Sequence, residues 1–130
     1  VFFIVFILNI VIMSFKFEKL QILQKAMSFG EDIYKPSLQF PKIEIYNLSS
    51  QIIRASDSIA LNISEGSIMQ SNPEYNRFLN YSVRSLTEVV TCLYKAKYRG
   101  YIDDQLFEKH YNEAYYLMNM IIAFKAKLKN

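Results

Sequence analysis

Polar side chains interrupt the apolar spacing of residues 58–66, SIALNISEG. Before this point apolar residues recur every three or four positions, as on one face of a helix, and the stripe continues to Ile63. Asn62 stands where the next buried position is expected, and Glu65 and Gly66 follow it directly. These groups could form a reactive site or could hydrogen bond to a neighbouring helix. Because an unpaired amide in a helical core costs about 1–3 kcal/mol, we expect Asn62 to have a partner.

Small hydroxyl side chains could supply that partner on a facing helix. Ser82 and Ser85 lie on or beside the apolar face of the next long segment, and Glu88 comes just after them. A buried amide paired in this way can set the register between helices. We therefore predict a structural polar motif, which consists of Ser58, Asn62, Glu65, Gly66, Ser85 and Glu88. Ligand binding by Asn62 and Glu65 is the alternative.

Patterns typical of catalytic and metal sites are missing from the sequence. His110 is the single histidine, whereas a helical di-iron site requires Glu-x-x-His pairs on two helices. Ser64 and Ser67 have no base with an orienting partner nearby, and three glycines cannot supply a glycine-rich phosphate loop. We therefore expect no enzymatic activity, no metal and no cofactor, and we expect His110 to be a solvated surface residue.

The composition is that of one helical domain. The chain has 130 residues, of which 52% are hydrophobic and 15% aromatic, so disorder is not expected. Three Gly and three Pro are too few for the turns of a β-sandwich. The net charge of +3 permits an anionic partner such as nucleic acid without requiring one. The single Cys92 excludes an intrachain disulfide and a cysteine-rich zinc site, and we expect a cytoplasmic location.

The most apolar stretch is VFFIVFILNIVI, residues 1–12. A membrane-spanning helix needs about 20 apolar residues, and a secretory signal has a basic region before its apolar core and small residues after it. Since neither pattern is met, we interpret residues 1–13 as a hydrophobic lead that is upstream of the true start or disordered. A short membrane-associated segment and an additional packing element are the alternatives. We expect residues 14–130 to form the folded domain, without a membrane partner.

Four helical segments account for this domain. The expected ranges are 17–36, 42–65, 73–99 and 104–128. Ser71 or Asn72 can cap the third helix and Asp103 the fourth, and Gly66 suits the left-handed residue that closes the second helix. The expected inward residues of the first helix are Leu20, Leu23, Met27, Ile33 and Tyr34. Short connections place neighbouring helices antiparallel, which predicts an all-α, up-down-up-down four-helix bundle.

Two longer stretches carry a family resemblance. SSQIIRASDSIALNISEGS and NPEYNRFLNYSVRSLTEVVTCLYKAKYRGYI resemble the four-helix bundle proteins encoded in intervening sequences of bacterial 23S ribosomal RNA genes, also called S23-type ribosomal proteins. The positions that match the family's S-I-x-x-N-I-x-E-G pattern are Ser58, Ile59, Asn62, Ile63, Glu65 and Gly66. Those that match its third-helix pattern are Phe78, Leu79, Ser85 and Glu88. Many members carry proline at the position of Ala60, so a straighter second helix is expected here.

The resemblance implies a homopentameric ring. It also implies a relation to the accessory protein of diversity-generating retroelements, which engages reverse transcriptase and nucleic acid. No catalytic residues transfer with it. From the resemblance and the charge we predict a non-enzymatic oligomeric adaptor that binds RNA or DNA through basic helix surface.

Cations and aromatic rings are the side chains that such a surface needs. Candidates for phosphate contacts are Lys42, Arg54, Arg77, Arg84, Lys95, Lys97 and Arg99. Candidates for base stacking are Tyr75, Tyr81, Tyr94 and Tyr98. A protein-only scaffold that docks a partner enzyme such as a reverse transcriptase is one alternative. A bundle tethered to a membrane through residues 1–12 is another.

Overall fold

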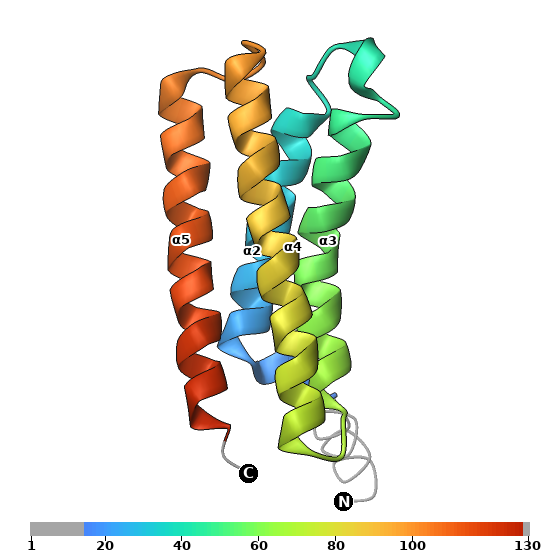
Figure 1. Cartoon of the computed structure of the whole chain (residues 1–130), viewed down its shortest axis with the longest axis vertical. Helices are drawn as coiled ribbons and strands as arrows, with labels where there is room; N and C mark the ends of the chain where they lie inside the picture. Colours follow the sequence, from blue (N-terminus) through green and yellow to red (C-terminus); the bar gives the residue numbers. More distant parts are fainter. Residues whose placement is uncertain (1–14, 129–130) are drawn as a thin grey trace, which may run out of the picture.

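The computed structural model describes residues 15–128. This part of the chain contains four long helices and two short 3-10 helices. The long helices are α2 (Gln21–Ser37), α3 (Leu48–Ser67), α4 (Asn72–Tyr98) and α5 (Asp104–Lys127). The short ones are η1 (Lys16–Lys19) and η2 (Lys42–Glu44). Successive long helices run in opposite directions (Figure 1), which confirms the predicted all-α four-helix bundle. The hydrophobic lead, residues 1–13, lies outside the described residues.

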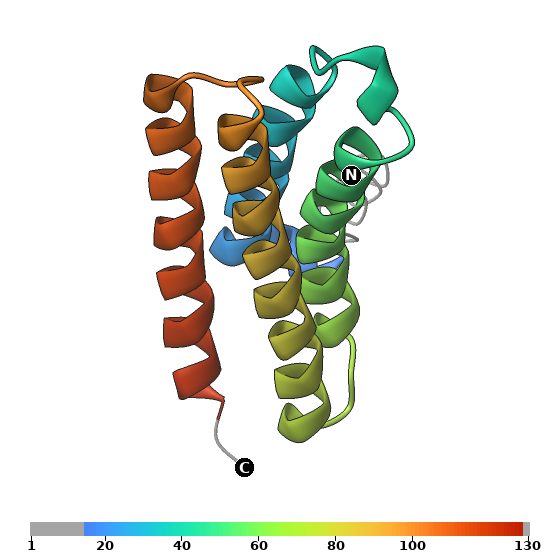
Figure 2. The same cartoon turned by 45° about the horizontal axis from the view of Figure 1, so that its top comes forward.

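Each long helix packs against the one that follows it in the chain, and the last, α5, also packs against the first, α2. Figure 2 shows α4 between α3 and α5, with α2 behind them. The contact between α3 and α4 is the most extensive, and that between α2 and α5 is the least. Among the helices of residues 15–128, none combines the length and apolar character needed to cross a membrane.

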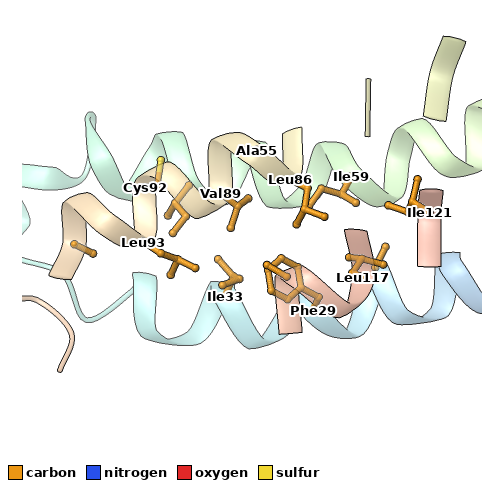
Figure 3. Packing of buried hydrophobic residues seen from close by; sticks show 14 of the residues in the cluster. Phe29, Ile33, Ala55, Ile59, Leu86, Val89, Cys92, Leu93, Leu117 and Ile121 are labelled. Atoms are coloured by element: carbon orange, nitrogen blue, oxygen red, sulfur yellow. The ribbon is translucent and has the colours of Figure 1, made fainter. Parts of the chain in front are cut away.

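The core is built from apolar residues that recur at alternating intervals of three and four. On α4 the buried positions at these intervals are Leu79, Ser82, Leu86, Val89, Leu93 and Ala96, and Cys92 is buried beside them. This spacing keeps one face of a helix inward, and the other three long helices follow the same pattern. Phe29 and Ile33 of α2 lie across the core from Leu86 and Val89 of α4 (Figure 3).

The inward face of α2 differs from the predicted one at two positions. Met27 and Tyr34 are exposed, while Ala26 and Phe29 are fully buried. A register based on Met27 and Tyr34 is offset by about 100° around the helix from one based on Ala26 and Ile33. The apolar residues of this segment are compatible with either face of α2 pointing to the core. The positions of α3 and α5 determine which face is buried.

The second long helix begins later than the sequence predicts. Residues 42–44 form η2, and α3 starts at Leu48. The side chain of Asn47, the residue before α3, makes no capping hydrogen bond. Instead, Glu44 Oε1 accepts hydrogen bonds from Leu48 N at 3.3 Å and from Asn47 Nδ2 at 3.1 Å. A carboxylate from the preceding turn thus replaces the usual cap.

Gly66 does not have the left-handed conformation predicted for it, since Gly100 is the only residue with positive φ within residues 15–128. Helix α3 continues through Gly66 to Ser67. A Cβ atom on Gly66 would lie 2.8 Å from Phe78 Cβ and 3.0 Å from Tyr75 Cδ1. The glycine therefore allows α3 and α4 to approach closely, and Gly100 (φ 76°) ends α4.

The predicted caps of the last two helices are confirmed. Ser71 Oγ accepts a hydrogen bond from Glu74 N at 3.3 Å at the start of α4. Asp103 Oδ1 accepts one from Leu106 N at 2.8 Å at the start of α5. Both bonds satisfy backbone donors of a first helical turn, which have no partner within the helix itself.

His110 is buried rather than solvated, with only 2% of its surface exposed. It stands between Phe107 and Ala114, at intervals of three and four residues, and both neighbours are buried. The apolar spacing of α5 therefore includes the imidazole. The sequence prediction was wrong because it gave the polarity of the residue more weight than its position.

Candidate functional site

A polar groove runs between α3 and α4 on the surface of the bundle. It has a volume of about 280 Å³ and is lined by Ser58, Asn62, Tyr81, Arg84, Ser85 and Glu88. Four of these residues belong to the structural polar motif expected from the sequence. We refer to this feature as the α3–α4 groove.

Hydroxyl and amide groups at the base of the groove form a short network. Asn62 Nδ2 donates to Ser58 Oγ and to Ser58 O, both at 2.9 Å. Ser85 Oγ donates to Ser58 Oγ at 2.9 Å and so joins α4 to α3. The partner of Asn62 is thus on its own helix, and the amide reaches α4 only through Ser58. One turn deeper, Ser82 Oγ donates to Ile59 O at 2.9 Å in the core.

Glu65 and Gly66 are separate from this network. Gly66 contacts Tyr75 and Phe78, as described above. Glu65 is exposed and does not line the α3–α4 groove. The two residues are neighbours in the chain, so their side-chain directions differ by about 100° around the helix. Because Gly66 faces α4, Glu65 must point away from the interface.

Arg84 and Glu88 bring opposite charges to the groove. Both are exposed, and within residues 15–128 neither forms an ion pair or a hydrogen bond. The groove therefore offers a free guanidinium group and a free carboxylate, together with the ring of Tyr81. It contains no nucleophile paired with a base. Such an arrangement can bind a polar ligand.

The groove forms the middle of a longer exposed surface that we call the outer face of α4. Its residues follow one another at intervals of three or four: Arg77, Tyr81, Arg84, Glu88, Thr91, Lys95 and Tyr98. All seven are exposed, because they lie on the side of α4 opposite its core face. Cations and tyrosines occupy five of the seven positions, and Glu88 and Thr91 lie in the middle.

Three of the seven predicted phosphate contacts are engaged in ion pairs. Arg77 Nη2 lies 2.9 Å from Glu74 Oε2, and Arg99 Nη1 lies 3.0 Å from Glu44 Oε2. Lys97 Nζ lies 3.7 Å from Asp104 Oδ1 and 4.6 Å from the ring centre of Phe107. Pairing with a carboxylate lowers the attraction of these cations for phosphate.

The other four predicted contacts have no acidic partner within residues 15–128. They are Lys42, Arg54, Arg84 and Lys95. Arg84 and Lys95 share the outer face of α4. Arg54 lies one turn from Ser58 along α3 and donates from Nε to Ser50 O at 3.4 Å. Lys42 is on η2, at the end of the bundle where α4 ends (Figure 1).

The predicted stacking residues also divide into two groups. Tyr81, Tyr94 and Tyr98 are exposed, and Tyr98 is the most open of them at 78%. Tyr75 is half-buried, with its ring centre 5.5 Å from that of Phe124. Its hydroxyl is buried without a hydrogen-bond partner, and burial raises the pKa of that hydroxyl. Tyr75 therefore packs between α4 and α5 and is not free to stack on a base.

The sequence reasoning missed two polar sites that join distant segments. One is Glu44, which binds the start of α3 and the connection after α4. The other is a buried cluster that consists of Asp32, His110 and Glu113. Neither has a sequence signal, because the partners meet only when the helices pack. Within residues 15–128, no group of three or more histidine, cysteine or acidic side chains is arranged to hold a metal ion.

Comparison with known proteins identifies the family. Residues 18–123 match the model of the 23S rRNA-intervening sequence protein family. The chain belongs to this family. This confirms the family resemblance that the motifs of α3 and α4 indicated.

A crystal structure of another protein has the same fold. It is a protein with unknown function from the S23 ribosomal protein family of Bacteroides thetaiotaomicron, which is 23% identical to this chain with a TM-score of 0.72. The match covers 80% of this chain and 97% of that chain. At this identity the likeness shows the fold alone. No curated protein matches the chain.

This 23S rRNA-intervening sequence protein also has two apolar grooves on opposite sides of the bundle. The α4–α5 groove, about 180 Å³, includes Tyr111, Tyr115 and Met118. The α2–α3 groove, about 380 Å³, includes Met27 and Leu61. The two grooves lie on opposite sides because the pair α4 and α5 and the pair α2 and α3 have no helix in common. Tyr115 is 63% exposed and Leu61 58%, so both grooves continue into open apolar surface.

Proposed function

We propose that this protein is a non-enzymatic oligomeric adaptor that binds RNA or DNA through the outer face of α4. The observation that carries the proposal is that exposed cations and tyrosines occupy five of the seven positions of this face. Arg84 and Lys95 have no acidic partner within residues 15–128. Tyr81 and Tyr98 are exposed, and each is three positions from one of these cations along α4.

The two residue types have complementary tasks on a nucleic acid. Guanidinium and ammonium groups bind phosphates regardless of sequence and release counterions when they do so. Tyrosine rings stack on any base, because every base has a flat aromatic surface. From Arg77 to Tyr98 the face extends over roughly 30 Å at 1.5 Å per residue. It can therefore accompany several nucleotides of a single strand.

Assembly into a ring would repeat this face and strengthen weak individual contacts. The α2–α3 groove of one copy can pack against the α4–α5 groove of the next, since both are apolar and lie on opposite sides. Such a head-to-tail contact generates a closed ring when the rotation between copies closes. A homopentamer, as the family resemblance implies, would present five copies of the outer face of α4 to one nucleic acid.

Fluorescence anisotropy with a labelled single-stranded RNA, and with DNA of the same sequence, tests the proposal. We expect binding at about 50 mM salt that weakens markedly at about 200 mM. The double variant Arg84→Gln, Lys95→Gln should weaken binding severalfold at low salt. The matched control, Lys35→Gln with Lys127→Gln, removes the same charge from exposed positions outside the face. Equal losses in the two variants, or no binding at low salt, would refute the proposal.

A protein-only scaffold that docks a partner enzyme such as a reverse transcriptase is the second candidate. The observation that favours it is the amount of exposed apolar surface, which includes Leu61, Ile68, Tyr115, Tyr116 and Ile122. The same measurements separate the two. An assembly that is stable by light scattering but does not bind nucleic acid at low salt would favour the scaffold.

A further inference from the structure

Three ionisable side chains meet where α2 packs against α5. His110 Nδ1 lies 3.3 Å from Glu113 Oε1, one turn further along α5. The carboxyl group of Glu113 also lies close enough to that of Asp32, on α2, to raise its pKa. The three residues therefore form one connected cluster across the pair of helices that has the least contact in the bundle.

Water is largely excluded from this cluster. His110 is 2% exposed and the Glu113 side chain 19%. Both imidazole nitrogens and Glu113 Oε1 are buried without a hydrogen-bond partner. Although Nδ1 and Oε1 are only 3.3 Å apart, their orientation does not form a hydrogen bond.

The surroundings favour a retained proton on Glu113 and disfavour one on His110. Burial and the Asp32 carboxyl group raise the pKa of Glu113 to about 7, against the weaker opposing effect of Lys109 and Lys25. Burial, together with Lys109, lowers the pKa of His110, against the opposing effect of Asp32. The ionisable groups that act on the pair thus come from α2 and α5, with no contribution from α3 or α4 within residues 15–128.

We propose that the Glu113 carboxyl group, held between Asp32 and His110, acts as a pH-dependent clasp between α2 and α5, which is closed while Glu113 is protonated and opens when Glu113 ionises. With the proton present, Glu113 can donate a hydrogen bond to the Asp32 carboxylate. Without it, two adjacent carboxylates repel each other in a poorly hydrated site. The α2–α5 contact then weakens.

The direction of the pH effect follows from Glu113. A carboxyl group whose pKa is raised in the folded state contributes stability that is complete below its ordinary value and is lost as the pH rises through about 7. Loosening of the α2–α5 contact is therefore expected between about pH 6 and pH 8. His110 acts in the opposite sense, since a neutral buried imidazole loses stability only as the pH falls below its ordinary value near 6.5.

Hydrogen exchange of the backbone amides in α5 measures the clasp. In the wild-type protein we expect protection of the turn around residues 110–117 to fall between pH 6 and pH 8, after correction for the intrinsic exchange rate. Glu113→Gln, which mimics the protonated carboxyl group, should keep this protection constant over the same range. Glu108→Gln is the matched control on the exposed side of α5 and should behave as the wild type does.

Nuclear magnetic resonance of the imidazole gives a second, independent measurement, because His110 is the single histidine of the chain. We expect its ring signals to show a titration step near pH 7 that Glu113→Gln and Asp32→Asn each abolish or displace. A single step near 6.5 that neither variant changes would overturn the proposal. Constant protection of the wild-type α5 from pH 6 to pH 8 would overturn it as well.

Discussion

Arg99 Nη1 donates a hydrogen bond to Glu44 Oε2 at 3.0 Å and so joins two segments that are 55 residues apart. The Tyr101 hydroxyl donates to the same oxygen at 2.6 Å, while the other carboxylate oxygen binds the start of α3. One buried carboxylate therefore connects η2, α3 and the α4–α5 connection. Arg99 was predicted from the sequence to contact phosphate, but in the structure it stabilises the fold by binding Glu44.

Replacing Glu44 by Gln should lower the melting temperature at neutral pH. The hydrogen bond from Tyr101, the bond from Leu48 N and the charge of Arg99 keep the pKa of Glu44 below its ordinary value, although burial acts in the opposite direction. The carboxylate therefore stabilises the fold above pH 4.5, and this contribution is lost as the pH falls below that value. Thermal melting of Glu44→Gln and wild type should thus converge in acid. The exposed Glu108→Gln serves as control, and an equal effect of both variants at pH 7 would contradict the prediction.

Gly66→Ala should destabilise the bundle by about 1–3 kcal/mol, because its methyl group would overlap with Phe78 Cβ at 2.8 Å. Gly30→Ala is the matched control in α2. Its nearest contact would be Ser56 Oγ at 3.4 Å, and the gain in helix propensity should stabilise the fold by about 0.5–1 kcal/mol. Urea unfolding of the two variants should therefore give changes of opposite sign. A neutral Gly66→Ala would show that α3 and α4 do not need their close approach.

Ser82→Ala should cost more stability than Ser85→Ala. Ser82 Oγ donates to Ile59 O in the core, and its loss removes about 1 kcal/mol and leaves the carbonyl with one partner fewer. Ser85 Oγ donates to Ser58 Oγ in the partly exposed groove, where water can replace it. Urea unfolding measures both. A larger loss of stability in Ser85→Ala would contradict this prediction. It would show that the hydrogen bond in the groove joins α3 and α4 more strongly than the one in the core.

Leu61→Glu should disrupt assembly through the α2–α3 groove, since it places a charge on apolar surface. Light scattering should give the wild-type protein a mass that is a multiple of 15.3 kDa and the variant a lower one. Tyr46→Glu is the control, because Tyr46 is 97% exposed and lines neither apolar groove. A monomeric wild type would remove the oligomeric part of the proposed function.

Cys92 should react very slowly with thiol reagents in the folded protein. It is buried, and burial together with the nearby Glu88 raises the pKa of its thiol to about 11. Little thiolate is therefore present at neutral pH, and the thiolate is the reactive form. Labelling should become fast only when urea unfolds the bundle. Rapid labelling without urea would indicate that the core around α4 opens easily.

Local signals in the sequence were sufficient to predict the helices. The apolar spacing of α4, and the caps Ser71 and Asp103, depend on residues within a few positions of one another. These interactions form wherever the segment becomes helical. The prediction was less accurate for the start of α3, where Glu44 replaces a standard cap.

The candidate site was only partly predictable for the same reason. One groove contains Ser58, Asn62, Ser85 and Glu88, because the packing of α3 against α4 places them at the same level of the bundle. Glu65 belongs to the same sequence pattern but points away, since α4 meets α3 at the neighbouring Gly66. A linear pattern does not specify on which side of a helix its partner will lie.

The amino-acid sequence by itself thus determined the class of fold, the number of long helices and the family, because periodicity, caps and motifs are properties of neighbouring residues. Only the tertiary structure decided that His110 is buried against Glu113 and that Arg99 binds Glu44. It also decided that Arg84 and Lys95 have no acidic partner among residues 15–128. The physical reason is that charge, burial and proton affinity depend on distance through space. Those distances exist only after the helices have packed.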